Sequence, residues 1–138
     1  MSLVIKKIKK IEKSNLSNID FDNLTFGDVF TDHMFVCSFK KGEWTNPEIK
    51  PYQPISISPS ARVFHYGQAC FEGMKAYKGP QNETLLFRPE ENAKRLNKSA
   101  TRLCMPEIPE DIFLNGLNEL LKLDSKWIPK EPTSALYI

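Results

Sequence analysis

Prolines limit where this chain can form helices. Four of the ten prolines fall within residues 47–60. Proline lacks a backbone N–H and its ring clashes with the preceding helical turn, so no helix survives that spacing. Proline is tolerated in strands mainly at sheet edges. The sequence therefore predicts an extended connection over residues 47–60, with the character of an edge strand.

Two amphipathic helices are predicted after residue 88. Pro89 suits the first helical position, and Glu90 and Glu91 favour the positive helix start. Apolar residues then recur at spacings of three and four, which is the pattern of one buried helical face. A second helix starts at Pro109. The predicted buried residues of the first helix are Ala93, Leu96, Ala100 and Leu103, and those of the second are Phe113, Leu117, Leu120 and Leu121.

The other segments have the composition of strands and turns. Aromatic and β-branched residues over 26–39 predict a strand buried on both faces, and Lys41-Gly42-Glu43 predicts a hairpin turn after it. A further strand is expected to begin within 71–77. A strong turn signal at 78–82 is followed by a returning strand over 84–88, so these segments predict a second hairpin.

Charge is concentrated at the start of the chain. The net charge is only +2, and residues 1–13 hold five lysines against one acidic residue, so the rest of the chain is slightly acidic. That distribution predicts a solvated arm rather than a nucleic-acid-binding surface. Ile5, Ile8 and Ile11 within this arm permit either a short amphipathic turn or an edge strand. The longest apolar runs have four residues, which is too short for a membrane-spanning helix.

Cysteine and histidine offer little chemistry by pattern. Cys37, Cys70 and Cys104 are far apart, form no CxxC pair and follow no secretion signal, so they are interpreted as reduced thiols of a cytoplasmic protein. His33 and His65 are isolated in the sequence, and no metal site is predicted. Common motifs for nucleophilic or phosphate chemistry, such as GxSxG, GxGxxG and the Walker loop, are absent.

Four features leave a functional role open. Aromatic and small residues alternate over 59–77, so Tyr66 and Phe71 could form either core packing or a ligand-binding wall, and the pattern favours the core. The basic residues of the first helix could hold a phosphate, although a solvated face is the simpler interpretation. Lys75 is interpreted as an outward charge rather than a reactive lysine, and Tyr137 as a core residue. The last six residues are β-prone with no turn after them, which predicts a chain cut from something longer.

Several segments, taken in order, resemble one known family. They are FGDVFTDHMF, PSARVFHYGQACFEGMKAY, LLFRPEENAKRLNKSATRLCMP and TSALY. They are similar to the N-terminal part of branched-chain amino-acid aminotransferases, which are pyridoxal-phosphate enzymes of fold type IV. The resemblance implies an α+β fold, a two-layer α/β sandwich with a largely antiparallel sheet and helices on one side. It also implies a division into a Lys-rich arm (1–20) and a small N-terminal domain (21–138), with the large C-terminal domain absent.

The resemblance also assigns roles to residues. Arg95 corresponds to the arginine that binds the phosphate of pyridoxal 5'-phosphate. Tyr66, Phe71 and Tyr137 correspond to the wall of the pocket for a branched substrate side chain. The family's Schiff-base lysine would lie beyond Ile138, so no catalytic residue is expected within this chain, and Lys75 has no catalytic role.

The implied reaction transfers the amino group of leucine, isoleucine or valine to 2-oxoglutarate, in a cytoplasmic homodimer that binds neither nucleic acid nor membrane. The chain alone is expected to be inactive, since it lacks the lysine. Two alternatives stay open. One is another fold type IV enzyme, either a D-amino-acid aminotransferase or an aminodeoxychorismate lyase. The other is a non-catalytic domain that self-associates through apolar surface.

Overall fold

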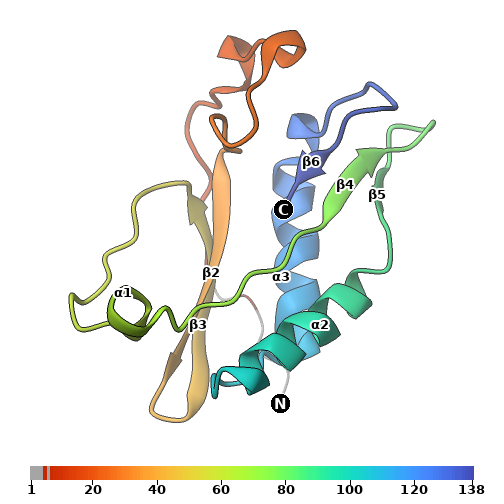
Figure 1. Ribbon diagram of the computed structural model, residues 1–138. Helices are drawn as coiled ribbons and strands as arrows, with labels where there is room; N and C mark the ends of the chain where they lie inside the picture. Colours follow the sequence, from red (N-terminus) through yellow and green to blue (C-terminus); the bar gives the residue numbers. More distant parts are fainter. Residues whose placement is uncertain (1–4, 6) are drawn as a thin grey trace.

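The computed structural model describes residue 5 and residues 7–138. Figure 1 shows a strand hairpin on one side, a long central helix, and a second small sheet on the other side. The strands are β1 (Lys7–Ile8), β2 (His33–Lys40), β3 (Glu43–Pro51), β4 (Lys75–Lys78), β5 (Thr84–Leu86) and β6 (Leu136–Tyr137). The α-helices are α1 (Arg62–Tyr66), α2 (Pro89–Arg102) and α3 (Glu110–Leu123), and the short 3-10 helices are η1 (Leu16–Asn18), η2 (Phe21–Asn23) and η3 (Ser125–Trp127).

The first sheet has the order β1-β3-β2, and its centre is the hairpin of β2 and β3. The predicted turn is confirmed. Lys41 and Gly42 both have positive φ, 52° and 86°. A two-residue turn with two positive φ values matches the right-handed twist of the flanking strands. The turn therefore fixes the pairing of Lys40 with Glu43, which begins the antiparallel register.

The prediction that the proline-rich segment is an edge strand is wrong for β3. β3 pairs with β2 on one side and with β1, in parallel, on the other. Pro47, the proline inside β3, is accommodated by a bulge, whereas Pro51 is the last residue of the strand. The register shifts between Val36 and Ser38, so Asn46 and Pro47 together stand opposite Cys37. Such a bulge leaves residues unpaired, and Pro47 therefore costs no ladder hydrogen bond although the strand is central.

The second sheet has the order β5-β4-β6, and all its pairs are antiparallel. The predicted hairpin turn between β4 and β5 is confirmed. β6 pairs Tyr137 with Lys75 and Leu136 with Ala76, so the β-prone end of the chain forms a strand. The predicted α+β class is confirmed, and the structure refines it: the strands form two separate three-stranded sheets.

Both long helices are confirmed, and α2 begins at Pro89 as predicted. Ala93 and Ala100 are each only 2% exposed, whereas Leu103, predicted on the same face, is 38% exposed because α2 ends just before it. The five-residue helix α1 was not predicted. It has no side-chain cap at its start, and it ends at Tyr66, directly before Gly67, whose φ is +57°.

The helix α3 forms the centre of the fold and contacts β2 and β3 on one side. Gly116 is buried there against the ring of Phe35: a β-carbon at Gly116 would lie 2.5 Å from the ring atom Cε1. The other side of α3 faces the second sheet. The buried cluster between them contains Ala76, Leu117, Leu121 and Ile128.

Residues 1–4 and 6 of the predicted arm lie outside the described residues. β1 is an edge strand, which confirms one of the two forms expected for this segment. The division of the chain into an arm (1–20) and a domain (21–138) stays a prediction. Among the described residues, no helix is long and apolar enough to cross a membrane.

Candidate functional site

The predicted phosphate arginine is held by a carboxylate. Arg95, on α2, donates from Nε to Glu72 Oε1 at 2.6 Å and from Nη2 to Glu72 Oε2 at 2.7 Å. This is a two-point ion pair, in which the planar guanidinium matches the planar carboxylate. The Glu72 side chain is 8% exposed, whereas the Arg95 side chain is 67% exposed. The carboxylate is therefore the fixed partner, and the guanidinium reaches from it toward solvent.

A second side chain of α2 holds the same carboxylate. Asn92, three residues before Arg95, donates from Nδ2 to Glu72 Oε2 and also to the carbonyl of Gly73 at 3.2 Å. The hydrogen bond from Arg95, reinforced by that of Asn92, lowers the pKa of Glu72 despite the opposing effect of burial. The same pair raises the pKa of Arg95. Both groups are consequently charged throughout the neutral range.

Gly73 connects this ion pair to Tyr137. A β-carbon at Gly73 would lie 2.5 Å from the Tyr137 hydroxyl oxygen. Only glycine therefore permits the tyrosine to lie over this backbone. Tyr137 also meets Phe26 edge to face, with ring centroids 5.2 Å apart. Tyr137 is 47% exposed, so its interpretation as a core residue is wrong.

A largely apolar cleft of about 1620 Å³ runs between the two sheets and α3. Phe71, Glu72 and Tyr137 line it, together with residues from the segment before β2 and from the end of the chain. Neither Tyr66 nor Arg95 is among the lining residues. The structure thus brings two of the three predicted pocket residues to one cleft, and Arg95 pairs with Glu72 of its lining.

Tyr66 and Phe71 are exposed. Tyr66 ends α1 and is 83% exposed, and Phe71 is 84% exposed. The interpretation that these two aromatics pack in the core is wrong for this chain, because the segment between α1 and β4 crosses the surface. Their role as a pocket wall, like that of Arg95 at a phosphate, stays a prediction. Lys75 is exposed, which confirms the prediction that it points outward.

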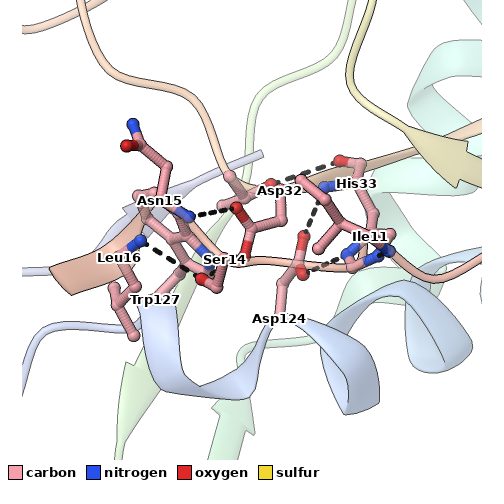
Figure 2. A network of polar contacts seen from close by, with 9 residues as sticks. Ile11, Ser14, Asn15, Leu16, Asp32, His33, Asp124 and Trp127 are labelled. Atoms are coloured by element: carbon pink, nitrogen blue, oxygen red, sulfur yellow. Dashed lines mark hydrogen bonds and ion pairs between the residues drawn. The ribbon is translucent and has the colours of Figure 1, made fainter. Parts of the chain in front are cut away.

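A buried polar network that the sequence did not predict is drawn in Figure 2. His33, 7% exposed, lies beside Asp124, 2% exposed, with Nδ1 and Oδ1 2.6 Å apart. The His33 backbone N–H donates to the other oxygen, Oδ2, at 3.1 Å. The Ile11 N–H donates to His33 Nε2 at 3.0 Å. Since Nε2 accepts, Nδ1 must carry the proton and donate to Asp124.

Asp32 extends this network to the N-terminal segment. It accepts from Ser14 Oγ at 2.5 Å, from the Asn15 N–H at 3.1 Å and from Trp127 Nε1 at 2.9 Å. Burial opposes ionisation of Asp32, but the hydrogen bonds from Ser14, Trp127 and Asn15 lower its pKa. The network ties residues 11–15 and the start of β2 to the region after α3.

Only weak sequence signals pointed to this network. His33 was interpreted as isolated because its partner Asp124 lies 91 residues away. The adjacent pair Asp32-His33 at the start of an apolar strand was the available clue, since buried polar residues need partners. Among the described residues, no group of three or more His, Cys, Asp or Glu side chains could hold a metal ion.

Comparison with known proteins relates this geometry to a family. The chain is 51% identical over 120 residues to branched-chain-amino-acid aminotransferase 2 of Bacillus subtilis (strain 168), which covers 86% of this chain and 33% of the relative. It is 48% identical over 120 residues to branched-chain-amino-acid transaminase 1 of the same strain, over 86% of this chain and 34% of the relative. It is 43% identical over 125 residues to branched-chain-amino-acid aminotransferase of Helicobacter pylori (strain J99 / ATCC 700824), over 90% of this chain and 37% of the relative.

The resemblance seen in the sequence is therefore confirmed, and the chain spans about a third of the length of these relatives. No protein-family model matches the chain.

Proposed function

We propose that this chain forms part of a branched-chain-amino-acid aminotransferase, which transfers the amino group of leucine, isoleucine or valine to 2-oxoglutarate. The observation that carries the proposal is the 43–51% identity to proteins with that name over 86–90% of the chain. The same relatives do not favour a D-amino-acid aminotransferase, an aminodeoxychorismate lyase or a non-catalytic domain.

The residues of the site fit the phosphate of pyridoxal 5'-phosphate. A guanidinium has five N–H donors, and Glu72 takes two of those on Arg95. Three donors are left on Nη1 and Nη2, enough to hold two phosphate oxygens through a second, charge-assisted pair of hydrogen bonds. The cofactor, when bound, supplies an electron sink for the carbanion formed at the substrate Cα. Arg95 contributes only to holding it.

The proposed substrate pocket is apolar. Phe71 and Tyr137 line the same cleft, which supports a shared role at the branched side chain, and Tyr66 lies five residues before Phe71. Burial of apolar area contributes about 25 cal/mol per Å². One methylene more or less changes binding by only about 1–3 kcal/mol. A pocket of this kind therefore accepts leucine, isoleucine and valine with modest differences.

Other parts of the proposal come from the family resemblance. The reactive lysine is placed beyond Ile138, so the chain alone is expected to be inactive. A cytoplasmic homodimer is expected, and the three separate free cysteines, Cys37, Cys70 and Cys104, fit a reducing compartment.

The test uses the full protein that carries this chain, incubated with leucine, 2-oxoglutarate and pyridoxal 5'-phosphate, with glutamate formation as the readout. Leucine is expected to be a far better donor than D-alanine, and Arg95→Gln should weaken cofactor binding by about tenfold or more, since a charged hydrogen-bond pair is lost. Arg102→Gln is the matched control, because Arg102 is an exposed arginine of the same helix. Equal rates with D-alanine, or no amino transfer at all, would reject the proposal.

A further inference from the structure

We propose that Glu72 is a positioning residue that determines which edge of the Arg95 guanidinium meets the cofactor phosphate. The inference rests on the proposed function and deepens it. Glu72 occupies the side edge of the guanidinium, formed by Nε and Nη2. The phosphate is therefore received at the end of the guanidinium, by the remaining hydrogens of Nη1 and Nη2.

Glu72 is fixed independently of Arg95. Asn92 braces it by donating to Oε2 while also donating to the Gly73 carbonyl, so the carboxylate and the adjacent backbone are held to α2 together. The Glu72 side chain is nearly buried at 8% exposure. A carboxylate held in this way is a rigid reference point for a flexible partner.

Arg95 needs such a reference point because two-thirds of its side chain is exposed. A long exposed arginine samples many rotamers, and an anion that binds it must first restrict them. The Glu72 contact restricts them before the anion arrives, which strengthens binding by preorganisation.

Charge repulsion between Glu72 and the phosphate predicts the opposite result from positioning, so the two explanations can be separated by experiment. A carboxylate next to an anion site repels the anion, so simple charge arithmetic says that neutralising Glu72 should tighten phosphate binding. If Glu72 instead positions Arg95, neutralising Glu72 should weaken phosphate binding. In addition, an amide at residue 72 would turn an NH₂ group toward one of the Arg95 donors and release the guanidinium. The sign of the change therefore separates a positioning residue from a competitor.

The backbone next to Glu72 also contacts a residue of the proposed substrate pocket. Gly73 follows Glu72 directly, and its missing side chain accommodates the Tyr137 hydroxyl. The residue that orients Arg95 is thus one peptide away from the backbone on which Tyr137 rests. A change at Glu72 is nevertheless expected to act first on the cofactor, because the Glu72 carboxylate is hydrogen-bonded to both Arg95 and Asn92.

The experiment compares Glu72→Gln with Glu91→Gln in the full protein, measuring the dissociation constant of pyridoxal 5'-phosphate by titrating the apoprotein and following cofactor absorbance. Glu91 is the matched control: it is an exposed glutamate of α2 that pairs with Lys94. Glu72→Gln should weaken cofactor binding about tenfold, the loss of one charge-assisted hydrogen bond. Glu91→Gln should leave it unchanged, and KM for leucine at saturating cofactor should stay within about twofold for both.

Two further measurements keep the outcome clear. The Nε–H signal of Arg95 in NMR should be protected from exchange in the wild type and lose protection in Glu72→Gln. If Glu72→Gln does not fold, Asn92→Ala, which removes the brace but keeps the charge, should weaken cofactor binding in the same direction.

The proposal is overturned if Glu72→Gln, or Asn92→Ala in its place, binds the cofactor as tightly as the wild type or more tightly. Failure of the proposed function would be seen separately, because then Arg95→Gln would also leave cofactor binding unchanged.

Discussion

Replacing Asp124 by asparagine tests the hydrogen-bond logic of the buried network. The Ile11 N–H makes Nε2 of His33 an acceptor, so Nδ1 is a donor, and it meets one oxygen of Asp124. The backbone N–H of His33 meets the other oxygen. Asparagine has the same shape but only one oxygen. Its NH₂ group must face one of these two donors, and switching the imidazole tautomer only moves the conflict to the Ile11 N–H.

The expected loss follows from the burial of these groups. Asp124 is 2% exposed and His33 is 7% exposed, so water cannot replace the missing acceptor. One buried donor left without a partner costs about 1–3 kcal/mol, and the surviving hydrogen bond to a neutral oxygen is about 1 kcal/mol weaker than one to a carboxylate. Together these predict that Asp124→Asn lowers the free energy of unfolding by about 2–4 kcal/mol.

Urea unfolding followed by tryptophan fluorescence measures this loss, since Trp127 is itself buried in the network. The midpoint should fall while the slope with urea stays constant. Asp28→Asn is the control, because Asp28 is an exposed aspartate, and its change should stay within about 0.5 kcal/mol. An Asp124→Asn variant as stable as Asp28→Asn would refute the conclusion that Asp124 must accept two buried hydrogen bonds.

Three further substitutions test other contacts. Gly116→Ala should lower stability by about 1–3 kcal/mol in the same urea assay, because the added methyl group meets the Phe35 ring; an unchanged midpoint would contradict the close packing. Asp32→Asn should lower the free energy of unfolding at pH 7. Because folding lowers the pKa of Asp32, the difference in unfolding free energy from the wild type should shrink as the pH falls below about 4. A difference that stays constant from pH 7 to 3 would argue against an ionised Asp32. Gly73→Ala should displace Tyr137 and raise KM for leucine in the full protein, and an unaltered KM would remove Tyr137 from the pocket.

Sequence reasoning succeeded where structure is decided locally. Lys41-Gly42 supplied a turn because glycine and a tolerant neighbour adopt positive φ. Pro89 marked the start of α2 because its ring presets the helical φ and its missing N–H is not needed there. In both cases the deciding interactions span at most four residues, which a single sequence displays directly.

Prediction from the sequence failed where contacts between residues far apart in the chain determine the structure. β3 was predicted as an edge because it carries prolines, yet a bulge at Pro47 lets it pair on both sides. No local sequence feature predicts that β1 pairs with β3. The same applies to the pair of Glu72 with Arg95, which are 23 residues apart, and to His33 with Asp124. Helix α1 was missed because five residues without a cap show no periodicity.

The exposure of the predicted pocket residues bears on how selectivity arises. A substrate side chain gains free energy against a wall only in proportion to the apolar area that both remove from water. Phe71 is 84% exposed and Tyr66 is 83% exposed, so a leucine side chain laid against either would keep its other side in water. Selection for branched side chains therefore requires a further wall. The match covers only about a third of each relative, and we expect that wall to come from the part of the relatives that this chain does not span. Phe71→Ala should consequently change the preference among leucine, isoleucine and valine in the full protein. Phe87→Ala should not, because Phe87 is a similarly exposed aromatic residue that does not line the cleft.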